Sequence, residues 1–135
     1  MMKNEFVTYE QAVVLKELGF DEECFAVYAI EHYNSLNPNK IVFYYLVNTE
    51  SLNDNEIKAP LYQQAFKHYR DTYGLEALVE RDHDNNKFKF RIYRYLYTGK
   101  GLQGVGVNFD TYEIAEEAAL NKLIEVVKYQ QNESD

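Results

Sequence analysis

The sequence predicts an α+β fold in which one antiparallel sheet of two hairpins has helices packed on one face. Helix-like and strand-like segments follow each other in the order helix, hairpin, helix, hairpin, helix. The loops between them are too short for the crossover connections of a parallel sheet. The chain has 135 residues, 46% of them hydrophobic and 27% charged, which suits one globular domain. We assign this domain to residues 1–130 and expect a polar, frayed tail over residues 131–135.

The first element is a helix expected over residues 9–18. Thr8 can cap its N-terminus, and Gln11, three residues later, completes a capping box. Gly19 supplies the left-handed residue that ends the helix, so that Phe20 can fold back on Leu15.

The segment over residues 24–33 is compatible with either a helix or a strand. The acidic run at 21–23 suits the first turn of a helix, whereas Phe25, Val27 and Ile30 favour a strand. Turn residues at 37–40 precede a β-branched and aromatic run at 41–47, and two such runs around one turn predict a hairpin. A polar loop is expected over residues 48–58.

A second helix is expected to begin at Pro60 and to end at Gly74. Its apolar side chains recur at helical spacing and form one stripe, which we expect to face the core. The stripe consists of Tyr62, Ala65, Phe66, Tyr69 and Tyr73.

The last third of the chain predicts a second hairpin and a third helix. The hairpin has strands over 76–82 and 87–97. A glycine-rich connection over 99–106 leads to a short edge strand near 105–109. The helix is expected over 112–129, with Asp110 and Glu113 as its capping box. Its apolar stripe consists of Ala115, Ala119, Leu120, Leu123, Val126 and Val127.

Composition favours binding over catalysis. The chain contains thirteen tyrosines and eight phenylalanines but only one cysteine and three histidines. Tyrosine combines an apolar ring with a polar hydroxyl and therefore suits a partly hydrated interface. Thirteen such rings are too many to bury, so the sequence predicts a non-enzymatic protein-interaction module that binds a protein partner or a second copy of itself.

The net charge of −8 repels polyanions and argues against a general nucleic-acid binder. One segment departs from this trend, because residues 87–100 contain five cations and no acid. The single Cys24 cannot form an internal disulfide, and no apolar run approaches the roughly 20 residues of a membrane span. We therefore expect a soluble, cytoplasmic protein that does not contact a membrane.

The basic segment is also the candidate binding surface. On a strand, alternate side chains point to opposite faces, so one face collects cations beside aromatic rings. This face carries Lys87, Lys89, Arg91, Tyr93, Tyr95 and Tyr97. The opposite face carries Phe88, Phe90, Ile92, Arg94 and Leu96 and resembles a core face with one interruption. The first face suits an acidic protein partner, single-stranded nucleic acid or plain solvent exposure.

Other motifs predict no catalytic residue, metal ligand or cofactor. The glycines at 99–104 match a dinucleotide-binding loop, but no helix follows directly. The segment 82–86 resembles a calcium loop whose sixth and twelfth positions fail. Cys24 and His32 would lie more than about 20 Å apart on one strand, and His68 lies off its helix's tyrosine stripe. An enzyme that uses paired carboxylates remains an alternative.

Three segments, over residues 6–20, 59–75 and 109–127, resemble those of small, uncharacterised proteins from gut bacteria and their phages. The shared features are a Thr-Tyr-Glu helix at each end and an Ala-Pro-Leu-Tyr-Gln-Gln-Ala-Phe helix between them. The resemblance covers about a third of the chain. It implies a phage or mobile-element context but supplies no activity and no site residues.

Overall fold

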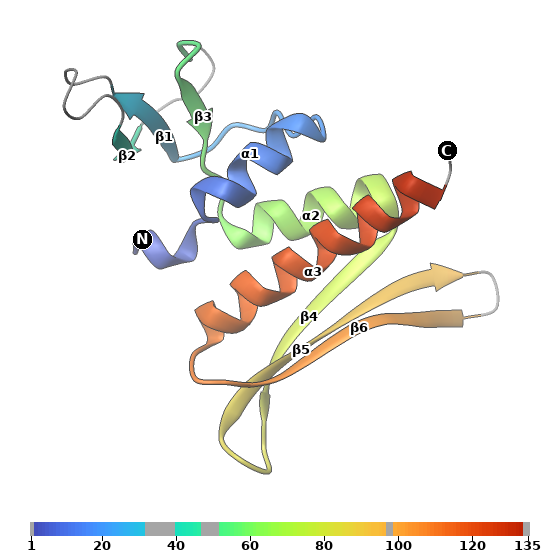
Figure 1. Ribbon diagram of the computed structural model, residues 1–135. Helices are drawn as coiled ribbons and strands as arrows, with labels where there is room; N and C mark the ends of the chain where they lie inside the picture. The colour runs from blue at the N-terminus through green and yellow to red at the C-terminus, as the bar shows by residue number, and fades with distance from the viewer. Residues whose placement is uncertain (1, 32–39, 47–51, 97–98, 134–135) are drawn as a thin grey trace. The chain divides into compact units, whose positions relative to one another are not determined.

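The computed structural model describes residues 2–31, 40–46, 52–96 and 99–133, which fall into two compact units, Met1–Leu61 and Tyr62–Asp135. Each unit combines helices with a three-stranded antiparallel sheet (Figure 1). The predicted α+β class is therefore confirmed. The strands form two sheets and not the single sheet that we expected. The expectation of one domain over residues 1–130 stays a prediction.

The first unit begins with the short 3-10 helix η1 (Lys3–Glu5) and the helix α1 (Tyr9–Glu17). The capping box is confirmed, because Thr8 Oγ1 accepts from the Gln11 amide at 3.2 Å and Gln11 Oε1 accepts from the Thr8 amide at 3.0 Å. At the other end Gly19 has φ of 88°, and the Phe20 amide donates to the Leu15 carbonyl. This is the predicted left-handed stop.

The sheet of this unit has the strand order β2-β1-β3. The strand β1 (Ala26–Glu31) settles the open choice over residues 24–33 in favour of a strand. It pairs with β2 (Lys40–Tyr45) as predicted, while the turn between them lies outside the described residues. The loop expected over 48–58 is partly wrong, because β3 (Glu56–Lys58) pairs with the other edge of β1.

An aromatic cluster stabilises one end of the first unit. The ring of Phe43 meets those of Phe6, Tyr28 and Tyr45 edge-on, at centroid distances of 5.3, 5.4 and 5.1 Å. Such geometry brings the positive ring edge onto the negative ring face. The Tyr28 hydroxyl also donates to the Val7 carbonyl at 2.6 Å, which ties the sheet to the segment before α1.

The second unit begins with α2 (Tyr62–Tyr73), which starts two residues after Pro60. Gly74, with φ of 67°, ends it as predicted. The stripe is confirmed in its first four positions, which are buried, whereas Tyr73 is partly exposed. The strands β4 (Leu75–Asp82) and β5 (Lys87–Leu96) form the predicted second hairpin.

The expected glycine-rich connection is instead a long strand, β6 (Gly99–Phe109), which pairs with β5. Two of its glycines lie where a side chain would collide with its neighbours. A Cβ at Gly106 would overlap the Phe90 ring, and one at Gly104 would lie 2.7 Å from the Lys122 side chain. Close approach to these groups explains Gly104 and Gly106, whereas Gly99 has a positive φ of 127° and open space around it.

The last helix, α3 (Tyr112–Glu133), lies against all three strands of this sheet and against α2 (Figure 1). The predicted capping box is wrong. Thr111 is the capping residue, and its Oγ1 accepts from the Ile114 amide at 3.1 Å. The helix continues to Glu133, and the polar, frayed tail expected over residues 131–135 stays a prediction.

The apolar stripe of α3 is confirmed except at Val126, which is only half-buried. In the core of the second unit, Phe90 and Ile92 are buried on one face of the sheet. We call this the inner face of the β4-β5-β6 sheet and the opposite one its outer face.

Candidate interaction surface

The predicted site residues lie on β5 with the expected alternation. Phe90 and Ile92 are 5% and 0% exposed on the inner face, whereas Tyr95 is 53% exposed on the outer face. Lys89 and Arg91 share the outer face with Tyr95, because alternate residues of a strand point the same way. Tyr93 lies between Arg91 and Tyr95 on that face, and Lys87 lies at its far end. Tyr97 lies outside the described residues.

Sequence reasoning missed a set of exposed aliphatic side chains on the same face. Cross-strand pairing places Leu78 of β4 and Val105 of β6 on either side of Arg91, and Leu102 beside Tyr93. Val107 follows Val105 at strand spacing. The exposed fractions are 42% for Leu78, 57% for Leu102, 57% for Val105 and 56% for Val107.

The sequence contains a signal that predicts this set of residues. From Gly99 to Val107, glycine alternates with longer side chains except at Leu102-Gln103, and such a period of two is typical of a strand with one crowded face. The glycines were interpreted as turn residues, so the aliphatic side chains between them were not placed on a surface.

The cations of the outer face are held by partners of this chain. Glu80 Oε1 lies 3.8 Å from Lys89 Nζ and 3.7 Å from Arg91 Nη2, so one carboxylate serves both. Lys87 Nζ binds the Asp110 carboxylate, and this hydrogen bond holds the pKa of Asp110 below its ordinary value. Part of the positive charge of this face is therefore balanced by carboxylates of the same chain, which weakens the face as an anion site.

Aromatic rings hold the remaining cation of this face. Lys100 Nζ lies 5.2 Å from the centre of the Tyr93 ring and 5.9 Å from that of Tyr95. Arg91 contacts Tyr93 from the other side, and its hydrogen bond with the Tyr93 side chain raises the pKa of the guanidinium. The two rings thus contact cations and are not available for stacking on bases.

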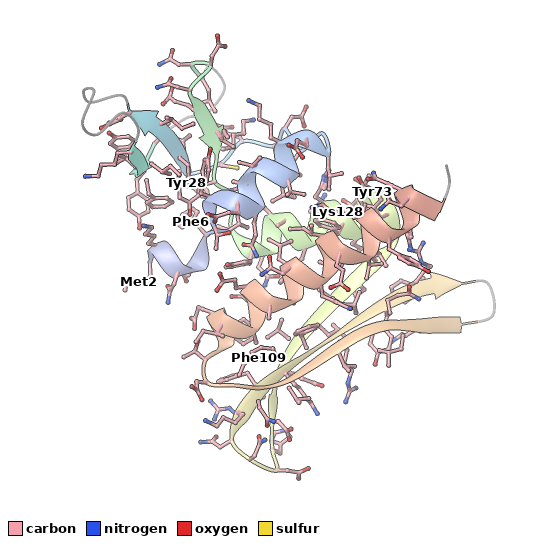
Figure 2. The ribbon with its side chains drawn as sticks, viewed as in Figure 1. Met2, Phe6, Tyr28, Tyr73, Phe109 and Lys128 are labelled. Atoms are coloured by element: carbon pink, nitrogen blue, oxygen red, sulfur yellow. The ribbon has the colours of Figure 1, made fainter. Side chains whose placement is uncertain are left out.

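The tyrosines as a whole do not form one surface. Among the described residues, the exposed tyrosines are Tyr44, Tyr45, Tyr95, Tyr112 and Tyr129, which belong to two different units and to both sheets and α3. Of these only Tyr95 lies on the outer face. The surface therefore depends on aliphatic side chains more than on the tyrosine surplus that suggested it. Figure 2 shows that the two faces of the second sheet both carry side chains.

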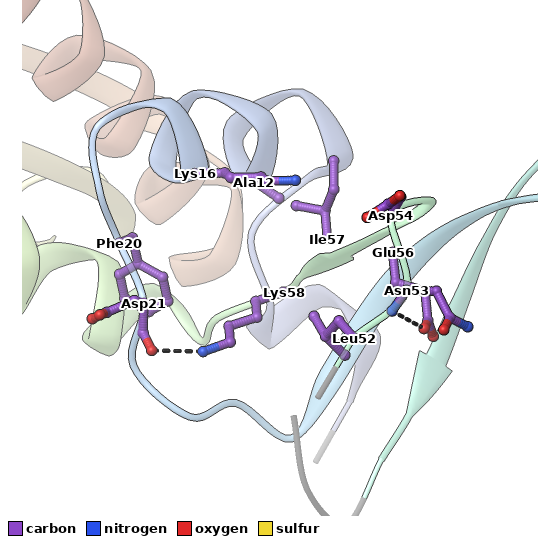
Figure 3. A pocket seen from close by; sticks show the side chains of 10 residues that line it. All are labelled: Ala12, Lys16, Phe20, Asp21, Leu52, Asn53, Asp54, Glu56, Ile57 and Lys58. Carbon is purple, nitrogen blue, oxygen red and sulfur yellow. Dashed lines mark hydrogen bonds between the residues drawn. The ribbon is translucent and has the colours of Figure 1, made fainter. Parts of the chain in front are cut away.

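A separate cavity of about 250 Å³ lies in the first unit, between α1 and β3 (Figure 3). Ala12, Phe20 and Ile57 line its apolar part. Lys58 Nζ donates to the Asp21 carbonyl at 2.6 Å, and Glu56 Oε1 accepts from the Asn53 amide at 2.9 Å. Two of the charged side chains that line the pocket, Lys58 and Glu56, are thus bound to main-chain groups of the same unit.

In the described part of the chain, the side chains most able to act in catalysis are buried. Burial raises the pKa of the Cys24 thiol to about 12, so a thiolate nucleophile does not form near neutral pH. Glu116 is the one carboxylate among the described residues that is buried, and Gln63 Nε2 donates to it at 3.2 Å. The ranges that the structure describes also contain no group of three or more potential metal ligands.

None of the helices in the described ranges has both the length and the apolar character of a membrane span. Comparison of the chain with protein-family models, with curated proteins and with solved structures finds no match.

Proposed function

We propose that this protein is a non-enzymatic interaction module that binds a protein partner through the outer face of its β4-β5-β6 sheet. The single observation that carries the proposal is the group of five exposed apolar side chains on that face. They are Leu78, Tyr95, Leu102, Val105 and Val107, each between 42% and 57% exposed. As part of this proposal, the helices α2 and α3 cover only the inner face of the sheet.

Exposed aliphatic side chains are normal singly, but several on one face favour a binding surface. Burying a fully exposed leucine or valine contributes about 1.5–3 kcal/mol. The polar groups among them suit a protein partner, because Glu80, Lys89 and Arg91 offer both charge signs beside the apolar side chains.

The nucleic-acid alternative has less support from the same geometry. Single-stranded nucleic acid needs free cations for its phosphates and free rings for its bases. Glu80 already holds Lys89 and Arg91, and Lys100 lies over Tyr93 and Tyr95. The carboxylate-enzyme alternative lacks a pair of buried acids among the described residues.

Affinity capture with a matched control tests the proposal. The tagged protein is incubated with an extract of the cells that encode it, and the bound proteins are quantified for the wild type, Leu78→Glu and Ile114→Glu. Ile114 is 47% exposed on α3 and controls for a new surface charge. We expect Leu78→Glu to lower the recovery of the partner by roughly tenfold or more, since 1.4 kcal/mol corresponds to a factor of ten.

Ile114→Glu should retain the partner. Equal recovery with Leu78→Glu and the wild type would remove the outer face as the binding surface. The phage or mobile-element context and the cytoplasmic location stay predictions.

A further inference from the structure

We infer that a second copy of this chain binds at the β6 edge, by antiparallel pairing of β6 with β6 of the partner subunit about Val105. The two sheets would then form one continuous six-stranded sheet with a two-fold axis at Val105. This inference goes beyond the proposed function, because it concerns the β6 edge and a second copy of this chain, whereas the proposed function concerns the outer face that includes Leu78.

The first argument is that β6 is a long edge strand whose middle carries neither charge nor proline. Among the described strands it pairs only with β5, in the order β4-β5-β6. Natural edge strands are kept apart by charges, proline, β-bulges or short length, and of these β6 has two irregularities and one lysine near its start. β6 has eleven residues, and the stretch over 101–107 contains neither a charged residue nor a proline. Its outward main-chain groups can therefore pair with another strand.

The other edge of the sheet differs in this respect. β4 carries Glu76, Glu80, Arg81 and Asp82, and it contacts α2. Charges at such positions discourage strand addition. Because β4 is charged and the middle of β6 is not, we assign the pairing with the second copy to β6.

The second argument is that β6 is complementary to itself when Val105 lies on the axis. Antiparallel pairing about residue 105 places residue 105 − n opposite residue 105 + n, so Lys100 lies opposite Asp110 of the partner subunit. The ends of the paired segment therefore bring opposite charges together, twice in one dimer. Asp110 is 73% exposed, so it is accessible to Lys100 of another copy even though it binds Lys87.

The apolar side chains follow the same symmetry. By this rule Leu102 lies diagonally opposite Val107 of the partner subunit, one position from direct pairing, and Val105 meets Val105 of the partner subunit. All three are between 56% and 57% exposed in the single chain. Apolar cross-strand pairs of this kind stabilise an antiparallel sheet.

The irregularities of β6 are also placed symmetrically. The register with β5 shifts once between Phe88 and Phe90 and once between Ile92 and Tyr93. These shifts lie on β6 between Gly106 and Phe109 and between Leu102 and Gly104, on either side of Val105. Each irregularity therefore lies opposite the partner's other irregularity, and the pairing keeps its register.

Cysteine cross-linking tests this geometry. Val105→Cys puts two thiols opposite each other across the axis, at the Cβ separation of about 4.5–5.5 Å that is typical of facing strand residues. Mild oxidation should convert most of this variant into a disulfide-linked dimer. Leu78→Cys is the matched control, because it lies on the same outer face at the opposite edge and should stay monomeric. Native Cys24 is 1% exposed and does not compete.

Light scattering gives the second measurement. The wild type should rise from 16.0 kDa toward twice that mass as concentration increases, and Val105→Lys should hold it at 16.0 kDa. Leu78→Lys should not change the mass. If Leu78→Cys cross-links as efficiently as Val105→Cys, two copies associate through the outer faces of their sheets. That result would overturn pairing at the β6 edge.

A wild type that stays at 16.0 kDa at high concentration and a Val105→Cys variant that does not cross-link would together overturn self-association. That result leaves the proposed function to the capture experiment, since Leu78→Glu alters the outer face without touching the β6 edge.

Discussion

The Phe90 ring lies directly over Gly106 of the neighbouring strand, in the space that a Cβ at this position would occupy. The ring is 5% exposed and stacks on Phe109 at a centroid distance of 5.8 Å. The absence of a side chain at Gly106 thus lets two aromatic rings pack against β6 on the inner face. Val105 and Val107, on either side of Gly106, carry the side chains of the outer face.

Replacing this glycine should destabilise the second unit. In Gly106→Ala the new methyl group must displace the Phe90 ring, and it also lies 2.9 Å from the Phe109 ring. Overpacking of a core typically costs about 1–3 kcal/mol. We expect a loss of that size in the free energy of unfolding, measured by urea denaturation with far-UV circular dichroism.

Gly104→Ala provides the matched control on the same strand. Its methyl group would meet only the side chain of Lys122, which is flexible and can move away. We expect a change within about 1 kcal/mol of zero, because alanine also restricts the unfolded chain. An equal loss in both variants would show that strand propensity, and not the Phe90 ring, sets the cost.

The helices were largely predictable because their signals are local. Thr8 with Gln11, Gly19 and Gly74 act within one or two turns, and the structure places each as expected. The wrong cap at Asp110 has a specific cause. The side chain of Asp110 is bound by Lys87, which lies 23 residues away, so Thr111 takes its place as the cap.

The strands were less predictable because pairing depends on distant residues. β3 has three residues in a polar stretch, and only its pairing with Tyr28 and its neighbours in β1 makes it a strand. The candidate site was predicted in part. The alternation of β5 was correct. The aliphatic side chains of β6 were not predicted, because Gly104 and Gly106 are explained by Lys122 and Phe90, which are distant in the sequence.

Two buried tyrosines should respond oppositely to loss of their hydroxyl groups. Tyr28 is 7% exposed and donates a hydrogen bond of 2.6 Å to Val7, whereas the Tyr69 hydroxyl is buried without a hydrogen-bond partner among the described residues. Burial also raises the pKa of Tyr69 above its ordinary value. A hydrogen bond contributes about 1 kcal/mol, while an unpaired buried hydroxyl is a cost.

We therefore expect Tyr28→Phe to lose about 1 kcal/mol of unfolding free energy and Tyr69→Phe to be neutral or stabilising. Urea denaturation of the two variants beside the wild type measures both effects. Similar losses in the two variants would mean that the Tyr69 hydroxyl has a partner in the folded protein.

The pair formed by Lys87 and Asp110 predicts a pH dependence. The hydrogen bond from Lys87 and its charge lower the pKa of Asp110 from the ordinary value of 3.8. Because the folded pKa is the lower one, the pair stabilises the protein above pH 3.8, and this stabilisation is lost as the pH falls through the folded pKa. Asp110 is 73% exposed, so added salt should move its pKa back toward the ordinary value.

Carboxyl NMR titration of Asp110 checks this expectation, with Lys87→Met as the comparison. The titration is best made in the Val105→Lys background, where only contacts within one chain contribute. We expect the pKa of Asp110 to lie below 3.8 in that background and to rise when Lys87 is replaced, because both the hydrogen bond and the charge are then removed. A pKa that does not respond to Lys87→Met would mean that the contact between β5 and the start of α3 does not persist in solution. The proposed pairing of Lys100 with Asp110 of the partner subunit would then lose the support of a carboxylate that Lys87 holds in place.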